Sequence, residues 1–243
     1  MERLLIVPAA GRGTRLGTAT PKVLVDVNGR PMLRHVLDIH APFVSRAIVV
    51  AHPSAARSIE AAVRDAPVPA KVVLQEVPTG MLDAILIAAA TATNHPARVW
   101  VSWGDQVAVQ RETLAGLAEA EDGSDVALPT VAREDPYIHL DRAADGRVIR
   151  VLQRREGDVM PPVGESDIGV FSLSARACFE QLPLYALDVV PAGGTGERNF
   201  LPFIAWMAAR GTVVTCACAD PREAVGINTP EELAAVAAYL AGR

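Results

Sequence analysis

Residues 4–22 read LLIVPAAGRGTRLGTATPK, a short apolar run that breaks into a loop rich in glycine and positive charge. A buried strand that ends in such a loop presents backbone N–H groups in a way that suits phosphate. Residues 3–25 contain no acidic side chain, whereas Arg12, Arg15 and Lys22 lie in or beside the loop. Because the whole chain has a formal net charge of −5, this local positive charge indicates a polyanionic ligand, and we expect a nucleoside triphosphate.

Two familiar phosphate-binding loops do not match this stretch. The dinucleotide-binding pattern is G-x-G-x-x-G, but Gly11 and Gly13 are followed by Gly17, one residue too late. A Walker loop places a lysine directly after its last glycine, and no glycine of this chain precedes a lysine. What remains is G-x-G-T-R-L, followed downstream by the pair Pro21-Lys22. The sequence therefore indicates a phosphate loop of another type.

The composition bounds the class of protein. Half of the 243 residues are apolar, yet no apolar stretch reaches the roughly 20 residues of a membrane-spanning helix, and the N-terminus does not resemble a secretory leader. The three cysteines, an odd number, predict reduced thiols and a cytoplasmic location. The negative net charge argues against nucleic acid as a partner. We expect one domain over residues 1–243; the oligomeric state stays open, with a homo-oligomer as one alternative.

Apolar runs rich in β-branched residues alternate with helical patterns along the chain, which is typical of an α/β fold with a mainly parallel sheet flanked by helices. Strands are predicted at 4–7, 47–51, 72–75, 99–102, 126–131, 168–173 and 213–217, and helices at 32–39, 55–64, 82–92, 112–120, 175–182 and 200–209. Asp145-Gly146 predicts a hairpin turn, and Thr229, Pro230 and Glu232 form a capping box that starts a last helix. The glycine-rich loop 193–196 is either a connector or a lid over the substrate.

An acidic residue and an amide are the candidate metal ligands. Asp105 follows Gly104 directly after the strand predicted at 99–102. Ligands of open α/β sheets bind beyond the carboxyl ends of the strands, and a carboxylate there can hold Mg²⁺ together with phosphate oxygens and water. Asn228 immediately precedes the cap of the last helix, so its amide is not used as the cap, and we choose it as the partner of Asp105. The alternatives are that Asp105 caps a helix or a turn, and that Asn228 only favours the turn in which it lies.

A glutamine at the end of the third predicted strand is the candidate reader of a base. The amide of Gln75 both donates and accepts hydrogen bonds, so it can pair with the N3/O4 edge of uracil or thymine, and with cytosine after a flip. Gly80, further along the chain, would let the backbone approach the base closely. Taken alone, Gln75 is equally well explained as a polar residue at a strand end. We expect a pyrimidine, with UTP or dTTP preferred and CTP next.

The loop pattern G-x-G-T-R-L with its Pro-Lys pair resembles the signature of sugar-phosphate nucleotidyltransferases, and most closely that of uridylyltransferase domains acting on N-acetylglucosamine 1-phosphate. The resemblance implies the Rossmann-like fold of the nucleotide-diphospho-sugar transferases, with Mg²⁺ as cofactor. Gly104-Asp105 matches the family's Gly-Asp metal ligand, and Val225–Asn228 resembles its Glu-Gly-Val-Asn, whose asparagine completes the metal site. The nucleotide-binding residues that it implies are Ala9, Ala10, Gly11, Arg12, Gly13, Thr14, Gln75, Gly80 and Gly104.

The reaction that the resemblance implies is attack by an oxygen of a phosphate monoester on the α-phosphorus of a nucleoside triphosphate, with release of pyrophosphate. Such an oxygen is already ionised near pH 7, because its second pKa is about 6, so no general base is required. Catalysis then reduces to alignment and stabilisation of charge. Arg15 and Lys22 are the expected catalytic residues: Arg15 would hold the leaving pyrophosphate and Lys22 would bridge the phosphates, while Asp105 and Asn228 would hold Mg²⁺ at the α-phosphate.

Further matches to the same family concern the acceptor. Residues 165–169 resemble its sugar-reading Glu-Ile-Asn-Thr-Gly, with Asp167 in place of the asparagine, and Arg155 falls at the lysine of its Glu-His-Lys. The segment that begins at Gly196 resembles its Gly-Glu-Tyr-Tyr-Leu. The sugar-phosphate-binding residues that the resemblance implies are Gln153, Arg155, Glu165, Asp167 and Glu197. The departures from the family's pattern leave the identity of the sugar open.

Two other functions stay open at this point. Residues 7–11, Val-Pro-Ala-Ala-Gly, also resemble the opening of cytidylyltransferases that act on polyol phosphates, although we find no match to their later segments. A catalytically silent relative that binds a nucleotide sugar and regulates a partner is the second alternative. Loss of Lys22 or Asp105 would be the expected mark of a silent relative, and both residues are present.

Overall fold

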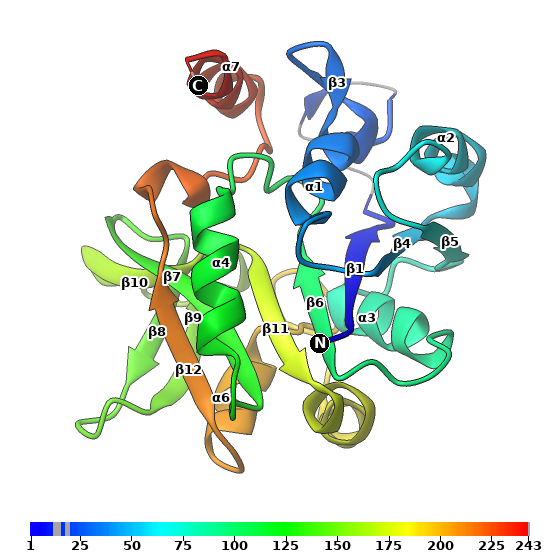
Figure 1. The fold of residues 1–243 in the computed structure, drawn as a ribbon. Helices are drawn as coiled ribbons and strands as arrows, with labels where there is room; N and C mark the ends of the chain where they lie inside the picture. Colours follow the sequence, from blue (N-terminus) through cyan, green and yellow to red (C-terminus); the bar gives the residue numbers. More distant parts are fainter. Residues whose placement is uncertain (12–15, 18–19, 243) are drawn as a thin grey trace.

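An eight-stranded sheet runs through the middle of the protein (Figure 1). The structure is a computed structural model that describes residues 1–11, 16–17 and 20–242. The strands of this sheet are β1 (Arg3–Ala9), β4 (Arg46–Ala51), β5 (Ala70–Leu74), β6 (Arg98–Ser102), β7 (Val126–Glu134), β10 (Val163–Asp167), β11 (Val170–Ser174) and β12 (Val213–Ala217). Their order is β10-β7-β11-β6-β1-β4-β5, and β12 pairs with β7.

The pairing of the strands gives a mixed, mainly parallel sheet, as predicted. β1 is parallel to both β4 and β6, so that Leu5 lies opposite Ala47 on one side and Trp100 on the other. β4 is also parallel to β5, and β12 to β7. The antiparallel strand β11 joins β6 to β7, and β10 is antiparallel to β7. The carboxyl ends of β1 and β6 therefore meet at the same edge of the sheet.

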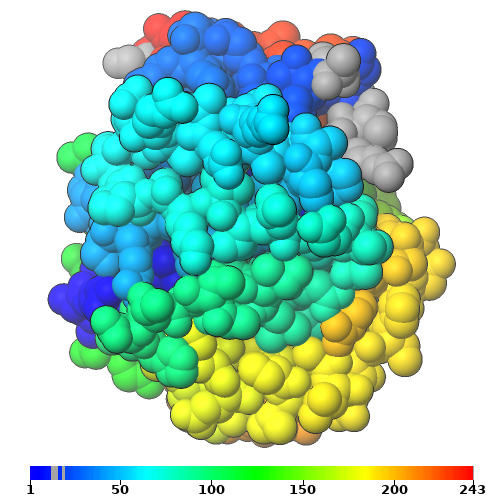
Figure 2. All heavy atoms as spheres, turned by 90° about the vertical axis from the view of Figure 1, so that its right-hand side faces the viewer, coloured from blue at the N-terminus to red at the C-terminus, as the bar shows by residue number. Residues whose placement is uncertain are grey.

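Helices cover both faces of the sheet, because the strand side chains that point to either face are apolar and must be buried. Leu5 and Val7 pack into a buried cluster with α1 (Met32–His40), α2 (Pro53–Val63), α4 (Arg111–Ala120) and α7 (Pro230–Ala241). Leu4 and Ile6 point the other way, into a cluster with α3 (Met81–Ala90), α5 (Leu182–Asp188) and α6 (Pro202–Ala208). Figure 2 shows the β5 edge, where side chains of α2, β5 and α3 form the surface and those of α5 lie beside them.

Smaller elements complete the fold. The predicted hairpin is confirmed as β8 (Ile138–Arg142) and β9 (Val148–Gln153), and a short antiparallel pair joins β2 (Asp26–Val27) to β3 (Arg30–Pro31). Short helical turns are η2 (Lys22–Leu24), η3 (Arg154–Glu156), the π-helical η4 (Ala177–Gln181) and η5 (Pro221–Ala224). None of the helices in the described part of the chain has the length and apolar character that a membrane span requires.

Most predicted elements are present with their ends shifted, and the capping box is confirmed. The Thr229 hydroxyl accepts from Glu232 N at 3.2 Å, and the Glu232 carboxylate accepts from Thr229 N at 2.9 Å. The strand predicted at 168–173 was wrong at its start. It begins only at Val170, because Gly169 adopts a φ of +75° and its N–H donates to the Asp167 carboxylate at 2.8 Å, which makes a turn between β10 and β11.

Two helix predictions also needed correction. The helix predicted at 175–182 begins at residue 175 as predicted, but it contains the π-helical turn η4 and continues as α5 to Asp188. The helix predicted at 200–209 begins at Pro202. Proline at the first helical position has no N–H to leave unpaired, which explains this start.

Candidate functional site

Three residues predicted to bind phosphate and metal meet in one cluster. Lys22 begins η2, Asp105 follows β6 and Asn228 precedes α7, so they come from distant parts of the chain. The Lys22 ammonium donates to Asn228 Oδ1 at 2.8 Å and also to Asp105 Oδ2. The side chains of Lys22 and Asp105 are only 18% and 16% exposed, so this ion pair is partly shielded from water and is stronger than a surface pair.

Close backbone packing brings these three residues together. Ile227 N donates to the Asp105 carbonyl at 3.3 Å, which docks the segment before α7 onto the turn after β6. A Cβ on Gly226 would lie 3.1 Å from Gln106 Nε2 and 3.4 Å from Asp105 Cγ, so the two segments are packed tightly at this glycine. On the other side of the turn, a Cβ on Gly104 would lie 2.6 Å from Val23 Cγ1. Gly104 thus lets β6 and η2 approach each other.

The donor set of this cluster fits Mg²⁺. A carboxylate oxygen of Asp105 and an amide oxygen of Asn228 converge on one cationic group, the Lys22 ammonium. Mg²⁺ prefers oxygen ligands and usually takes one or two carboxylates, with substrate phosphates and water in the remaining positions. Among the described residues, no group of three or more His, Cys, Asp or Glu side chains is placed to hold a metal by itself. A cation at this cluster would therefore depend on phosphate oxygens to complete its coordination.

The nucleotide loop is described only in part. Ala9 and Ala10 are buried where β1 ends, and Gly11 is exposed beyond them with nothing within 4 Å of an added Cβ. Arg12, Gly13, Thr14 and Arg15, which the sequence predicts to bind the triphosphate, lie outside the described residues. The loop nevertheless leaves β1 at the sheet edge where β6 leads into Asp105, and it returns at Lys22.

The predicted base-reading residues are close together, and Gly80 also packs against the backbone of Arg198. Gln75 is buried, and its amide Nε2 donates to the Gly80 carbonyl at 3.2 Å. A primary amide has two N–H groups and one carbonyl, so this bond leaves a donor and an acceptor for a base. A Cβ on Gly80 would lie 2.4 Å from the Arg198 carbonyl oxygen. The glycine therefore makes room for the backbone of Arg198.

Three of the predicted acceptor residues lie in one cluster. Arg155 Nη2 donates to Glu197 Oε2 at 3.3 Å. Gln153 is buried, and its Oε1 accepts from Asn199 Nδ2 at 2.5 Å. Sequence reasoning missed Asn199, although it stands two positions after Glu197 in the segment singled out for its resemblance to the family. It also missed Glu156, which pairs with Arg155 at 3.2 Å.

The other two predicted acceptor residues, Glu165 and Asp167, are engaged elsewhere. Arg142 donates to both carboxylate oxygens of Glu165, at 2.6 and 2.7 Å. Burial acts to raise the pKa of Glu165. The hydrogen bonds from Arg142 and Thr130, together with the positive charge of Arg142 and the charge of His139, outweigh burial and keep that pKa below its ordinary value. Over the described part of the chain, no hydrogen bond or ion pair joins Glu165 or Asp167 to Arg155 or Glu197.

Asp167 is a buried acid at the turn between β10 and β11. Burial raises the pKa of its carboxyl to about 6, although the bond from the Gly169 N–H acts in the opposite direction. Asp167 Oδ2 has no hydrogen-bond partner within the described residues. The family's asparagine at this position would be neutral at every pH, so the aspartate gives this turn an ionisable group.

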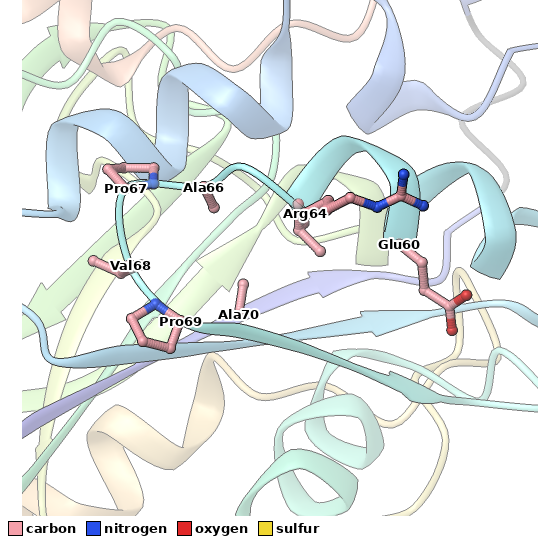
Figure 3. A pocket seen from close by; sticks show the side chains of 8 residues that line it. Glu60, Arg64, Ala66, Pro67, Val68, Pro69 and Ala70 are labelled. Atoms are coloured by element: carbon pink, nitrogen blue, oxygen red, sulfur yellow. The ribbon is translucent and has the colours of Figure 1, made fainter.

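A surface hollow of about 610 Å³ lies away from this site (Figure 3). It is lined by the end of α2 and the connection to β5, with Glu60 and Arg64 as its charged side chains. Ala70 and Ala47 pair at the amino ends of β5 and β4, so the hollow lies at the edge of the sheet opposite to Asp105. It contains none of the predicted site residues.

Comparison with known proteins gives related sequences over the whole chain. The bifunctional protein GlmU of Pelotomaculum thermopropionicum is 30% identical over 250 residues, which cover 100% of this chain and 53% of that protein. The bifunctional protein GlmU of Paracoccus denitrificans is 32% identical over 238 residues, which cover 96% of this chain and 52% of that protein. The chain thus spans about half the length of these curated relatives.

A solved structure and a family match complete the comparison. The 4-diphosphocytidyl-2C-methyl-D-erythritol synthase of Anaerococcus prevotii superposes with a TM-score of 0.71 at 14% identity, covering 99% of this chain and 98% of that one. This likeness concerns the fold, which agrees with the predicted nucleotide-diphospho-sugar transferase type. Residues 5–201 match the family of MobA-like NTP transferase domains. Because this match covers β1, its loop, the Asp105 turn and the acceptor cluster, the chain belongs to the family of MobA-like NTP transferase domains.

Proposed function

We propose that the protein is a Mg²⁺-dependent nucleotidyltransferase that joins a pyrimidine nucleoside triphosphate, UTP or dTTP, to a sugar 1-phosphate and releases pyrophosphate. The observation that carries the proposal is the convergence of Lys22, Asp105 and Asn228 at the sheet edge where the predicted phosphate loop leaves β1. A cation and two oxygen ligands beside a phosphate loop are what transfer at a phosphorus centre requires. Sugar specificity rests on the sequence signature and on the Gln153, Arg155 and Glu197 cluster.

The chemistry requires alignment rather than a base. An ionised oxygen of the sugar phosphate forms a bond to the α-phosphorus, and the bond from that phosphorus to the oxygen bridging to the β-phosphate breaks, so that pyrophosphate leaves with both electrons. Mg²⁺ held by Asp105 and Asn228 would neutralise charge on the triphosphate. Lys22, whose ammonium donates to those two oxygens in this structure, would then direct its ammonium to the phosphates. Arg155 would hold the phosphate of the acceptor.

The experiment that tests this function is a panel assay of pyrophosphate release. Five triphosphates (UTP, dTTP, CTP, ATP and GTP) are crossed with a set of sugar 1-phosphates and polyol phosphates, with and without Mg²⁺. We expect turnover that needs Mg²⁺ and is fastest with UTP or dTTP and a sugar 1-phosphate. Preference for CTP with a polyol phosphate would support the cytidylyltransferase alternative. Release with no pair, in a folded protein that still binds a nucleotide sugar, would support the regulatory alternative.

Gln75→Leu is expected to flatten the discrimination among bases. The substitution leaves the buried edge of a pyrimidine unpaired, which costs about 1–3 kcal/mol. The kcat/KM for UTP should therefore fall by about fivefold to 150-fold, while that for ATP changes little. Measured kcat/KM values for all five triphosphates check this. Gln181→Leu, the same change on the outlying η4 turn, is the matched control. If Gln75→Leu lowers all five values equally, Gln75 does not read the base.

A further inference from the structure

The carboxylate of Glu156 fastens the glycine-rich loop at residues 193–196 to η3. Glu156 Oε2 accepts from the N–H groups of Gly194 and Thr195 at 3.2 and 3.1 Å, and its Oε1 accepts from the Thr195 hydroxyl at 2.9 Å. The Glu156 side chain is only 10% exposed, so these bonds satisfy a charge that is largely withdrawn from water. The loop is therefore a docked segment in this structure.

The same carboxylate helps to orient Arg155. Arg155 Nε lies 3.2 Å from Glu156 Oε1, while its Nη2 donates to Glu197 Oε2 at 3.3 Å. Thr195 Oγ1 also accepts from Glu197 N at 3.2 Å, which ties the backbone of Glu197 to the docked loop. A planar guanidinium that contacts two carboxylates, of which that of Glu156 is held by the loop, has less freedom to rotate than a free one. Its side chain stays 31% exposed, so it is still accessible to a ligand.

The contact between loop and helix is too close for a side chain. A Cβ on Gly194 would lie 2.3 Å from the Arg155 carbonyl oxygen and 2.9 Å from Glu156 Cα. The loop residues Ala192 and Gly193 also form one wall of a hollow of about 610 Å³, whose other lining includes Gln153 and Asn199. The position of the loop therefore shapes the surface beside the predicted acceptor residues.

The docked loop leads directly into the segment that contacts the base-reading residues. Arg198 N donates to the Thr79 carbonyl at 2.7 Å, and Leu82 N donates to the Arg198 carbonyl at 3.2 Å. On one side of Arg198 stands Glu197, bonded to Arg155, and on the other stands Asn199, bonded to Gln153. The backbone of Arg198 is thus hydrogen-bonded to the segment that follows the predicted base-reading Gln75. The side chains of its two neighbours are hydrogen-bonded to the predicted acceptor residues.

We propose that Glu156 is a positioning residue for the acceptor. Its carboxylate holds loop residues 194–195 and Arg155, so that Arg155 meets the phosphate of a sugar phosphate and Glu197 meets its hydroxyl groups. Glu156 touches neither substrate and acts only through these neighbours. The proposal rests on the proposed function, because it takes the acceptor to be a phosphate monoester that carries hydroxyl groups.

The test compares Glu156→Ala and Glu156→Gln with the wild type on two readouts. The first is the KM of each substrate, measured with the triphosphate and sugar phosphate that the wild type turns over fastest. We expect Glu156→Ala to raise the acceptor KM by about tenfold and the triphosphate KM by less than about threefold. The variant weakens binding of the sugar phosphate and leaves the contacts of the triphosphate in place. Glu156→Gln, which keeps one acceptor oxygen, should recover part of the acceptor KM. Glu60→Ala, an exposed glutamate on α2 (Figure 3), is the matched control.

The second readout is amide hydrogen exchange at Gly194 and Thr195, which needs no substrate. Exchange at these two amides should be faster in Glu156→Ala and unchanged in Glu60→Ala. Equal rises in both KM values, or unchanged exchange at the two amides, would overturn the proposal. If Glu156→Ala does not fold, Thr195→Val removes one of the three bonds to Glu156, together with the bond from Glu197 N, at an exposed residue. It should raise the acceptor KM and also speed exchange at Gly194, whose amide bonds only to Glu156 in this network. If the wild type turns over no sugar phosphate, the proposed function fails, whereas the exchange rates still decide whether Glu156 holds the loop.

Discussion

Asp105→Asn is expected to lower kcat by about 10²-fold or more, which corresponds to about 2.7 kcal/mol at about 1.36 kcal/mol per decade. The substitution keeps the shape of the side chain and removes the charge that would hold Mg²⁺ on the triphosphate. It also removes the ionic partner of Lys22, which the structure places against Asp105 Oδ2. Steady-state kinetics over a range of Mg²⁺ concentrations checks the loss, and binding of Mn²⁺ in the presence of the triphosphate, followed by electron paramagnetic resonance, checks its cause.

The matched control for this change is Asp122→Asn. Asp122 is exposed on the turn after α4, so the same loss of charge there should leave kcat unchanged and alter stability by no more than about 0.5 kcal/mol, as is usual for surface substitutions. Thermal unfolding of both variants shows whether the fold is intact. A folded Asp105→Asn protein with near-normal turnover and unchanged Mn²⁺ binding would refute the assignment of Asp105 as a metal ligand.

Lys22→Met is expected to lower kcat by about 10²–10³-fold, the usual effect of removing one preorganised donor that stabilises developing charge. Methionine keeps the length of the side chain but has no charge to balance the departing pyrophosphate. Lys22→Arg should not restore full activity, because a planar guanidinium is larger than an ammonium and does not fit between the same two oxygens. Single-turnover measurements at saturating triphosphate separate the chemical step from binding.

The chain itself supplies the control for the lysine. It contains only two lysines, Lys22 and Lys71, among 23 basic residues. Lys71 is exposed on β5, so Lys71→Met makes the same substitution far from the cluster and should retain activity. If the two variants retain equal activity, Lys22 has no role in the transfer and its bonds to Asp105 and Asn228 are structural.

Local patterns were enough to predict much of the fold. The apolar run at the start of β1, the hairpin turn at Asp145-Gly146 and the capping box at Thr229 each depend on neighbouring residues, and the structure contains all three. The cluster of Lys22, Asp105 and Asn228 was also within reach, because parallel strands place their carboxyl ends at one edge and the resemblance named the residues. Their functional roles stay predictions that the variants above would test.

Features that depend on distant partners were not predicted. β10 contains Gly164 and Ser166 and has no apolar alternation, so it forms a strand only because it pairs with β7 and packs on the hairpin, where a Cβ on Gly164 would lie 2.5 Å from His139 Nδ1. The close contact of Gly80 with the Arg198 backbone is likewise invisible in the local sequence. The same holds for Glu156, whose loop partners follow 38 and 39 positions later.

The bond between Lys22 and Asn228 spans 206 positions of sequence, whereas the bond between Lys22 and Asp105 spans 83. During synthesis, at roughly 5–20 residues per second, the lysine and the carboxylate are therefore present well before the amide is made. A growing chain on the ribosome can form the ion pair but lacks the second oxygen ligand until residues 225–228 emerge and dock on the turn after β6. The cluster is consequently completed only after residues 225–228 have been made, by the same event that seats α7.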